Sequence, residues 1–331
     1  MIGYYVHHHG AGHRQRALAI SRHLRAPVTG LSSLPAPPGW PGAWVELPRD
    51  DEPALDAAAA AAAAVTAGGR LHWVPQRHPG LRSRTARIAA WAEETGPALL
   101  VVDVSVEVTV LGALLGVPVV VCAMLGDRDD APHRLGRDVA TALLAPWPGA
   151  DTRPVTGPAV FHVGAFSRFD DRRPDPAAVV AGTVLVLWGS GGSDVTEDDF
   201  AAARAATPGW TWRYRVPGTG GGVTDPDGLW RDLESADVVV VHGGHNAVAE
   251  VATARRPAVV VAQRRPFAEQ ERRSDLLADL GLVARHRWPD PHEWAGLLQR
   301  AHEVGGDVWK GWSPGDGAQR AARVLDGLAG R

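Results

Sequence analysis

The sequence has very few of the residues that mark several large classes of protein. Cys122 is the single cysteine among 331 residues, which excludes an intrachain disulfide framework and is typical of a reducing compartment. Lysine occurs once beside 33 arginines, and a formal net charge of −3 gives no reason to expect nucleic-acid binding. No run of about eighteen apolar residues could cross a bilayer, and the first residues do not resemble a signal peptide. We therefore expect a cytoplasmic protein.

The chain does contain a series of short apolar runs separated by helical patterns. The runs do not alternate between polar and apolar residues, which is typical of parallel sheets covered by helices on both faces. The fold class predicted is therefore α/β, with two Rossmann-like, doubly wound parallel-sheet domains in 1–165 and 166–312. A helix in 313–331 is expected to pack back on the first domain. The expected strands are 2–6, 98–103, 117–122, 183–188, 237–241 and 257–262.

Two helical segments in the first half carry no catalytic pattern. Residues 57–64 are eight consecutive alanines, which favour a helix but give it no large apolar face, so we expect it to be peripheral. A second segment has arginines interspersed with apolar residues, and any contact with a membrane is expected to be peripheral and to use this helix. Its residues are Arg82, Arg84, Arg87, Ile88 and Trp91.

The stretch His7-His8-His9-Gly10-Ala11-Gly12-His13 joins an apolar strand to a helical pattern. A purification tag is disfavoured because the histidines directly follow a strand. A metal site is disfavoured because adjacent histidines on a tight turn are expected to diverge and no H-E-x-x-H or C-x-x-C partner occurs. A dinucleotide fingerprint fails because Gln15 stands at the third glycine position. The remaining interpretation is a glycine-rich turn with His13 at a helix N-terminus, where the imidazole stays neutral and can accept a proton.

A second strand, glycine turn and helix pattern occurs at 237–257. His242 ends the strand, Gly243 and Gly244 allow close approach of the backbone to a ligand, and Asn246 and Glu250 are one helical turn apart. A carboxylate there could accept hydrogen bonds from a ribose diol, while the helix N-terminus holds a diphosphate. An ordinary tight turn followed by a helix explains the same residues. The residues alone leave both interpretations open.

These motifs resemble those of known enzymes. The pattern H-G-G-x-N-x-x-x-E, followed by Pro257 and Glu269-Gln270, resembles the donor-binding region of GT-B nucleotide-sugar glycosyltransferases, including the H-C-G-W-N-S-x-x-E signature of the family 1 plant and macrolide enzymes. The opening G-x-G-H-x-x-R resembles the first loop of family 28, which contains the peptidoglycan N-acetylglucosaminyltransferase. Segment 162–168 resembles the interdomain V-G-x-x-x-R of that family, and segment 184–194 resembles its second glycine loop. The match is strong in the C-terminal half and weaker across 25–160.

The resemblance implies a set of site residues. It places Glu250 on the ribose, Glu269 and Gln270 on hydroxyls of the transferred sugar, and His13 near the acceptor. His9, Gly10 and Gly12 would belong to the acceptor loop, where His7 and His8 line the site or pack beneath it. Residues that would face the donor diphosphate are Gly189, Ser190, Gly191, Gly192, His242, Gly243, Gly244 and Asn246.

The sequence departs from the family pattern at three places. Ala247 replaces the usual Ser or Thr, so one hydroxyl contact to phosphate is missing. Ala262 replaces a common proline, and Arg273-Ser274 replaces the Asn-Ala that often follows the glutamine. These departures bear mainly on the identity of the sugar.

The reaction expected from the resemblance is a metal-independent, inverting transfer of a sugar from a UDP- or dTDP-linked donor. The acceptor would be a hydroxyl or amine of a small molecule or a lipid-linked glycan, and no cofactor is expected. Candidates for the base are His13, Asp103 and Glu107, and Asp103 would serve equally well as a helix N-cap. The acidic clusters at 127–130, 170–171 and 197–199 do not follow an apolar strand as the metal-binding D-x-D motif does.

Three alternatives use related architectures. A nucleotide-sugar hydrolase would have the same opening G-x-G-H-x-x-R but would use water as the acceptor. A non-hydrolysing epimerase would need further acidic residues that the sequence does not place. A non-enzymatic nucleotide-sugar sensor would have no need of His13.

Overall fold

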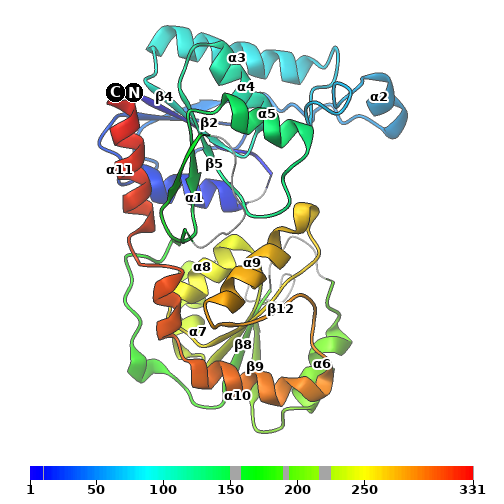
Figure 1. Cartoon of the computed structure of the whole chain (residues 1–331), viewed down its shortest axis with the longest axis vertical. Coiled ribbons are helices and arrows are strands. Elements are labelled where there is room, and N and C mark those ends of the chain that lie inside the picture. Colours follow the sequence, from blue (N-terminus) through cyan, green and yellow to red (C-terminus); the bar gives the residue numbers. More distant parts are fainter. Residues whose placement is uncertain (10, 150–157, 189–193, 216–224, 331) are drawn as a thin grey trace.

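The computed structural model describes residues 1–9, 11–149, 158–188, 194–215 and 225–330. Within them the chain forms two separate parallel sheets, each covered by helices, as Figure 1 shows. The first sheet has seven strands in the order β3-β2-β1-β4-β5-β6-β7. Its strands are β1 (Ile2–Tyr5), β2 (Val28–Ser32), β3 (Ala43–Glu46), β4 (Leu99–Asp103), β5 (Val119–Cys122), β6 (Ala142–Ala145) and β7 (Ala159–His162).

The second sheet has five strands in the order β12-β11-β10-β8-β9. All pairings between neighbouring strands in both sheets are parallel. The predicted α/β fold with two parallel sheets is confirmed. The strands are β8 (Thr183–Leu187), β9 (Thr211–Arg215), β10 (Val238–His242), β11 (Ala258–Val261) and β12 (Val283–Arg285).

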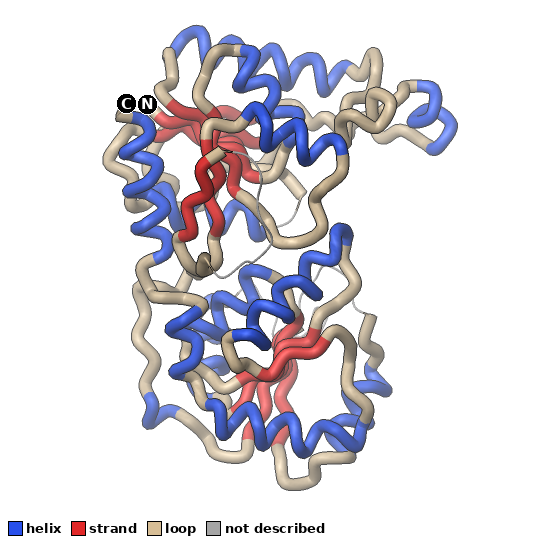
Figure 2. Tube along the Cα trace, in the orientation of Figure 1, coloured by secondary structure: helices blue, strands red, loops and turns tan. Residues whose placement is uncertain are grey.

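Helices lie on both faces of each sheet (Figure 2). The first sheet is covered by α1 (Ala11–Ser21), α3 (Pro79–Thr95), α4 (Val106–Leu114), α5 (Ala131–Val139) and α11 (Gly317–Ala329), and the short helix α2 (Ala57–Ala62) lies outside this layer. The second sheet is covered by α6 (Glu197–Ala205), α7 (Pro226–Ser235), α8 (His245–Thr253), α9 (Glu269–Asp279) and α10 (Trp294–Val304). Short 3-10 helices occur at Pro176–Ala178, Pro266–Ala268, Pro291–Glu293 and Asp307–Gly311.

The central strands are buried because apolar side chains point to both of their faces. Every residue of β4 and β8 is buried, as the uninterrupted apolar sequence predicts. Side chains on the two faces of the first sheet fall in different clusters, with Val101 in one and Val102 in the other. Both β1 and β4 are therefore held rigidly, and the residues that follow them are placed at a fixed edge of the sheet.

The last helix, α11, lies against the first half of the molecule although it ends the chain (Figure 1). It contacts α1, and Leu325 is fully buried in the cluster that contains Ile2 and Ala17. The Asp326 carboxylate also accepts hydrogen bonds from the backbone N–H groups of residues 25 and 26 at 3.0–3.1 Å. The C-terminal residues thus complete the core of the first sheet.

The sequence predicted a peripheral helix at 57–64 and a membrane-facing helix around 82–91, and the structure agrees with only the first prediction. The polyalanine segment forms α2, which has no buried residue and projects from the body. The membrane-facing interpretation of α3 is wrong for Arg84, Ile88 and Trp91, whose side chains are buried against the first sheet. Among the described helices none is both long and apolar enough to cross a membrane.

Candidate functional site

The candidate residues lie where the order of the strands reverses in each sheet. In the first sheet the chain runs outward from β1 to β2 and β3, then returns to place β4 on the other side of β1. In the second sheet the same reversal falls between β8 and β10. Ligands in open α/β sheets bind beyond the carboxyl ends of the strands at such points. His13 lies in the helix that follows β1, Asp103 ends β4, and His242 ends β10.

His13, Asp103 and Arg16 form one buried polar cluster. The Nδ1 atom of His13 is 3.1 Å from Oδ1 of Asp103. Arg16 donates two hydrogen bonds to Asp103, from Nε to Oδ2 at 3.0 Å and from NH2 to Oδ1 at 2.7 Å. Asp103 is fully buried, whereas the side chain of His13 is 17% exposed. Burial alone would raise the pKa of Asp103, but Arg16 and His13 outweigh it and hold the pKa well below its usual range.

The proton on His13 can occupy either ring nitrogen, and the neighbours favour different forms. Nδ1 of His13 lies 3.1 Å from Arg16 NH2 as well as from Asp103. A proton on Nδ1 donates to the Asp103 carboxylate and leaves a lone pair on Nε2, whereas a hydrogen bond from Arg16 requires an unprotonated Nδ1. Only the first form makes Nε2 a base.

Two roles that the sequence left open do not fit the structure: helix capping by Asp103 and catalysis by Glu107. Asp103 is not the N-cap of α4, because Ser105 caps that helix by accepting a hydrogen bond from the Val108 N–H at 3.2 Å. Glu107 lies away from His13: its Oε1 atom accepts hydrogen bonds from the backbone N–H groups of His72 and the next residue at 2.7 and 3.0 Å. Glu107 therefore fastens a loop, and of the three base candidates the structure brings only His13 and Asp103 together.

The loop before His13 is more compact than the sequence predicts. The rings of His8 and His9 are 4.2 Å apart between centroids, so the expectation that adjacent histidines diverge is wrong. His9, assigned to the acceptor loop, contacts Asp51 at 3.1 Å. Gly10 lies outside the described residues. A Cβ atom on Gly12 would lie 3.0 Å from Nδ2 of Asn246, so the two halves of the molecule meet closely at this glycine.

In the second half of the molecule, where the nucleotide sugar would bind, Nε2 of His242 can donate a hydrogen bond. Its Nδ1 atom accepts one from the Gly244 N–H at 3.0 Å, which leaves the ring proton on Nε2. Burial, followed by Arg265 and Arg273, lowers the pKa of His242 to about 4, so the ring is neutral near pH 7. Gly244 is the N-cap of α8 and has no side chain to cap the helix, so the N-terminal N–H groups remain available to a ligand.

Glu250 pairs with Arg168, which belongs to the V-G-x-x-x-R segment. Arg168 Nε is 2.8 Å from Glu250 Oε1, and the Glu250 side chain is 5% exposed. Burial raises the pKa of Glu250 to about 7, against the opposing effect of Arg168. The adjoining cavity of about 10 Å³ is lined also by Gln15 and Asn246, which are joined by a hydrogen bond of 2.9 Å. The space holds about one water molecule, so a ribose reaches Glu250 only if the two halves separate.

The other residues that were predicted to bind the nucleotide sugar lie in different surroundings. Gln270 is buried and its Oε1 atom accepts a hydrogen bond from the Gln263 N–H at 3.0 Å, so this side chain supports the loop after β11. Glu269 pairs with Arg273 at 2.9 Å and lies 3.8 Å from Arg128 of the first half. The predicted diphosphate loop, Gly189, Ser190, Gly191 and Gly192, lies outside the described residues.

Sequence reasoning missed a cavity of about 150 Å³ at the carboxyl ends of β4 to β7. It begins at Val104 and Ser105, directly after Asp103, and Arg128 and His133 supply polar groups at its wall. No sequence signal identifies it, because its walls come from several separate segments. Its apolar lining includes Val104, Val121, Leu125, Leu143, Trp147 and Val160.

Comparisons with solved structures identify the architecture. A glycotransferase of kitacinnamycin aligns over 99% of this chain and 98% of its own, with a TM-score of 0.69 and 17% identity. MurG of Acinetobacter baumannii aligns over 99% and 98%, with a TM-score of 0.59 and 14% identity. The chain has the GT-B fold.

Another GT-B structure was solved with ligands. UGT2 of Phytolacca americana, complexed with UDP-2fluoro-glucose and pterostilbene, aligns over 98% of this chain and 94% of its own, with a TM-score of 0.61 and 14% identity. No protein-family model and no curated protein sequence matches the chain. At these identities the similarity establishes the GT-B fold, and the chemistry has to be argued from the site.

Proposed function

We propose that the protein is an inverting glycosyltransferase that moves a sugar from a UDP- or dTDP-linked donor to a hydroxyl or amine of an acceptor. The observation that carries this proposal is the His13–Asp103 pair at the switch point of the first sheet. It lies across from the glycine turn between β10 and α8, since Gly12 approaches Asn246. A base and an anion-binding helix N-terminus thus share one cleft.

In the proposed reaction His13 acts on the acceptor. With Nδ1–H donating to Asp103, Nε2 takes the proton from the acceptor hydroxyl as its oxygen attacks the anomeric carbon of the sugar. The bond from that carbon to the diphosphate oxygen breaks on the opposite face, and the nucleoside diphosphate leaves with the electron pair. Asp103 orients the imidazole and stabilises its charge, while Arg16 keeps Asp103 ionised.

Groups of the second half would stabilise the departing diphosphate. His242 can donate from Nε2, and the N–H groups of the first turn of α8, after Gly244, have no side-chain cap. The NH2 atom of Arg168 is buried without a hydrogen-bond partner among the described residues, and this guanidinium lines the small cavity beside Glu250. These groups favour a leaving group stabilised by the protein alone. We therefore propose that no divalent metal and no cofactor take part.

The cavity beside Asp103 supports a small apolar acceptor. A volume of about 150 Å³ with aliphatic and tryptophan walls suits a flat, hydrophobic molecule bearing one reactive hydroxyl. The pterostilbene of the plant enzyme complex is a small molecule bound to a protein of the same fold. The burial of the apolar residues of α3 gives no support to a membrane-bound acceptor. We therefore favour a small molecule over a lipid-linked glycan.

The test is an incubation of the protein with UDP- and dTDP-sugars and a panel of small phenols and aliphatic alcohols, in buffer containing EDTA. Release of nucleoside diphosphate should depend on the acceptor, a product with the mass of acceptor plus sugar should form, and its anomeric configuration should be inverted. Magnesium or manganese should not increase the rate. Release of free sugar at the same rate without any acceptor would instead establish a hydrolase and refute the transferase.

A further inference from the structure

A cluster of imidazoles and carboxylates lies between the loop that follows β1 and the segment that follows β3. His8 belongs to this cluster, and its side chain is 2% exposed. Its Nε2 atom makes no hydrogen bond to any described residue, yet it lies 3.5 Å from Oδ2 of Asp51 and 3.6 Å from Oδ1 of Asp50. A buried ring nitrogen without a partner is costly. It points at two carboxylates, in a position where a cation would satisfy all three groups.

His9 supplies a second imidazole to the same position. Its Nε2 atom is 3.1 Å from Oδ2 of Asp51, the oxygen that His8 also approaches. The turn is fixed because the His9 N–H donates a hydrogen bond to Nδ1 of His7 at 3.1 Å, and the ring of His7 stacks on that of His8. One ligand atom from each of His8, His9 and Asp51 lies within 4.8 Å of the others.

The spacing and the ligand types suit zinc. Ligand atoms about 2.0–2.1 Å from a tetrahedral Zn²⁺ ion lie about 3.3 Å from one another. The two distances to Asp51 Oδ2, 3.1 and 3.5 Å, fall on either side of that value. Two imidazoles and a carboxylate favour zinc over magnesium or calcium, which prefer oxygen ligands alone. We propose that His8, His9 and Asp51 form a binding site for one zinc ion.

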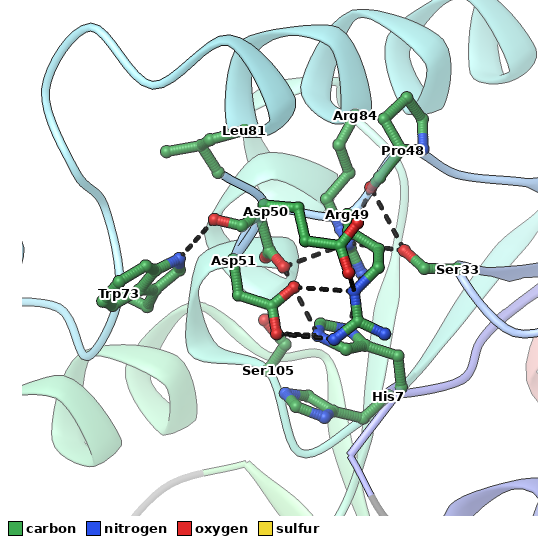
Figure 3. Close-up of polar contacts among 12 residues, drawn as sticks. His7, Ser33, Pro48, Arg49, Asp50, Asp51, Trp73, Leu81, Arg84 and Ser105 are labelled. Atoms are coloured by element: carbon green, nitrogen blue, oxygen red, sulfur yellow. Dashed lines mark hydrogen bonds and ion pairs between the residues drawn. The ribbon is translucent and has the colours of Figure 1, made fainter. Parts of the chain in front are cut away.

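The surrounding charges are compatible with a cation. Figure 3 shows Asp50 and Asp51 beside Arg49 and Arg84, with dashed lines marking their ion pairs. Arg49 also pairs with Glu52 at 2.8 Å, so three carboxylates face two guanidinium groups.

Two contacts oppose the ion and define what must change on binding: Arg49 NH2 donates to the proposed ligand atom Asp51 Oδ2 at 2.7 Å, and Arg84 faces His8. Arg84 NH2 lies 3.4 Å from Nδ1 of His8, and zinc on Nε2 places the ring proton on that Nδ1. The contact is long, and the shorter hydrogen bond of the same NH2 group goes to the Tyr5 hydroxyl at 2.7 Å. Arg84 can therefore give up the His8 contact and keep its stronger partner.

A second group of two histidines and one aspartate differs from the His8 cluster in the contacts of its imidazoles. His72, Asp130 and His133 also converge, but both ring nitrogens of His133 are already engaged. Nδ1 is 2.7 Å from Asp130 Oδ1, and Nε2 is 2.9 Å from Arg128 NH1. Zinc on Nδ1 of His133 would place the ring proton on Nε2, against Arg128 NH1 at 2.9 Å, which is a shorter contact than the 3.4 Å between Arg84 and His8, so zinc is assigned to the His8 cluster.

Zinc at this position would fasten the segment after β3 to the loop that leads to His13. His7, in the same loop, has its ring 5.6 Å from the ring of His13. The ion would therefore hold one rim of the cleft, and it would take no part in bond making or breaking. Zinc binding holds or fails independently of glycosyl transfer.

The experiment is a calorimetric titration of zinc into protein made without an affinity tag and dialysed against EDTA. We expect one zinc ion per chain with a dissociation constant on the order of 1 µM or tighter. His9→Ala should weaken binding at least tenfold without unfolding, since this side chain is 64% exposed. The matched control is His286→Ala, because His286 is also exposed and pairs with a carboxylate, Asp275, at 2.6 Å.

A second measurement tests how the metal is coordinated and does not depend on how tightly zinc binds. Cobalt(II) added to the dialysed protein should give the intense visible absorption of a four-coordinate site in the wild type and in His286→Ala, and should lose it in His9→Ala and Asp51→Asn. Circular dichroism establishes that each variant is folded. A wild-type protein that binds no zinc at about 100 µM, or binding of equal strength in His9→Ala, would overturn the assignment.

Discussion

The proposed base, His13, has two neighbours that compete for the same ring nitrogen. Asp103 and Arg16 both lie 3.1 Å from Nδ1 through their nearest atoms, and they also bind each other. Asp103 is fully buried, and the guanidinium of Arg16 donates two hydrogen bonds to its carboxylate. The same ion pair thus anchors α1 to β4 and holds the carboxylate that contacts Nδ1 of His13.

Removing one partner of this buried pair should be costly. Asp103→Asn leaves the Arg16 guanidinium buried without a counter-charge, and we expect the free energy of unfolding to fall by about 3–5 kcal/mol. Replacing both residues, as Arg16→Leu with Asp103→Asn, should cost less than the sum of the two single changes. Chemical denaturation of the four proteins measures this coupling. Strictly additive effects would show that the pair contributes no coupling energy.

Glu250 gives a pH-dependent prediction. Its pKa is raised to about 7, so the folded protein holds a proton there below that pH and releases it above. A ribose diol donates hydrogen bonds and therefore binds the ionised form, so affinity for a nucleotide sugar should increase about tenfold from pH 6 to pH 8. A nucleotide sugar is the right probe because its two phosphates do not titrate in this range.

The control for that titration is Glu250→Gln, which retains an oxygen near Arg168 but has no proton to lose. Its affinity should be lower at pH 8 and independent of pH. Calorimetry with UDP-glucose and a dTDP-sugar measures both proteins. If the variant kept the pH dependence of the wild type, another group would be responsible and Glu250 would leave the ribose site.

Among the elements, α11 packs on α1 of the first half although it ends the chain. Leu325→Ala should destabilise the protein by about 2–5 kcal/mol, because the side chain is fully buried. The matched control is Leu114→Ala in α4, whose side chain is 79% exposed and whose loss should change stability by less than about 0.5 kcal/mol. Hydrogen exchange should show the loss of protection in β1 and α1. Loss confined to the second sheet would contradict the packing.

The sequence predicted the central strands because each is an uninterrupted apolar run. It missed β2, β3, β6 and β7 of the first sheet and β9 and β12 at the edges of the second. The edge strands β3, β7, β9 and β12 are partly exposed and do not form uninterrupted apolar runs. Strands β2 and β6 are buried, but Thr29 and Gly30 interrupt the first and the second has only four residues. Helices α1 and α8 were placed correctly because each follows a glycine turn.

The candidate site also has residues that the sequence predicted and contacts that it did not. His13, Asp103 and the 242–250 motif were found because each follows a strand end, which chain order alone can locate. The bidentate contact of Arg16 with Asp103 and the pairing of Arg168 with Glu250 join segments more than eighty residues apart. The apolar cavity and the partnership of His9 with Asp51 are also tertiary contacts. Such proximities arise from the fold and have no signal within one segment.

At the scale of the whole molecule, the two halves are held together at the place where the donor would bind. Asn246 Nδ2 donates a hydrogen bond to Gln15 Oε1 at 2.9 Å, and the adjoining cavity is too small for a ribose. Donor binding must therefore separate the halves and break this hydrogen bond. Gln15→Ala removes a contact worth about 1 kcal/mol and should tighten nucleotide binding by up to about fivefold. An unchanged or weaker affinity would show that the closed arrangement does not oppose binding.

The central claim is that His13 takes the proton from the acceptor. The most direct measurement is single-turnover transfer from a nucleotide sugar by the wild type, His13→Ala and the exposed control His23→Ala, with donor affinity measured in parallel. His13→Ala should lower the rate at least about a hundredfold, with donor affinity and melting temperature unchanged, and His23→Ala should match the wild type. A His13→Ala protein that transfers sugar at the wild-type rate would contradict the claim.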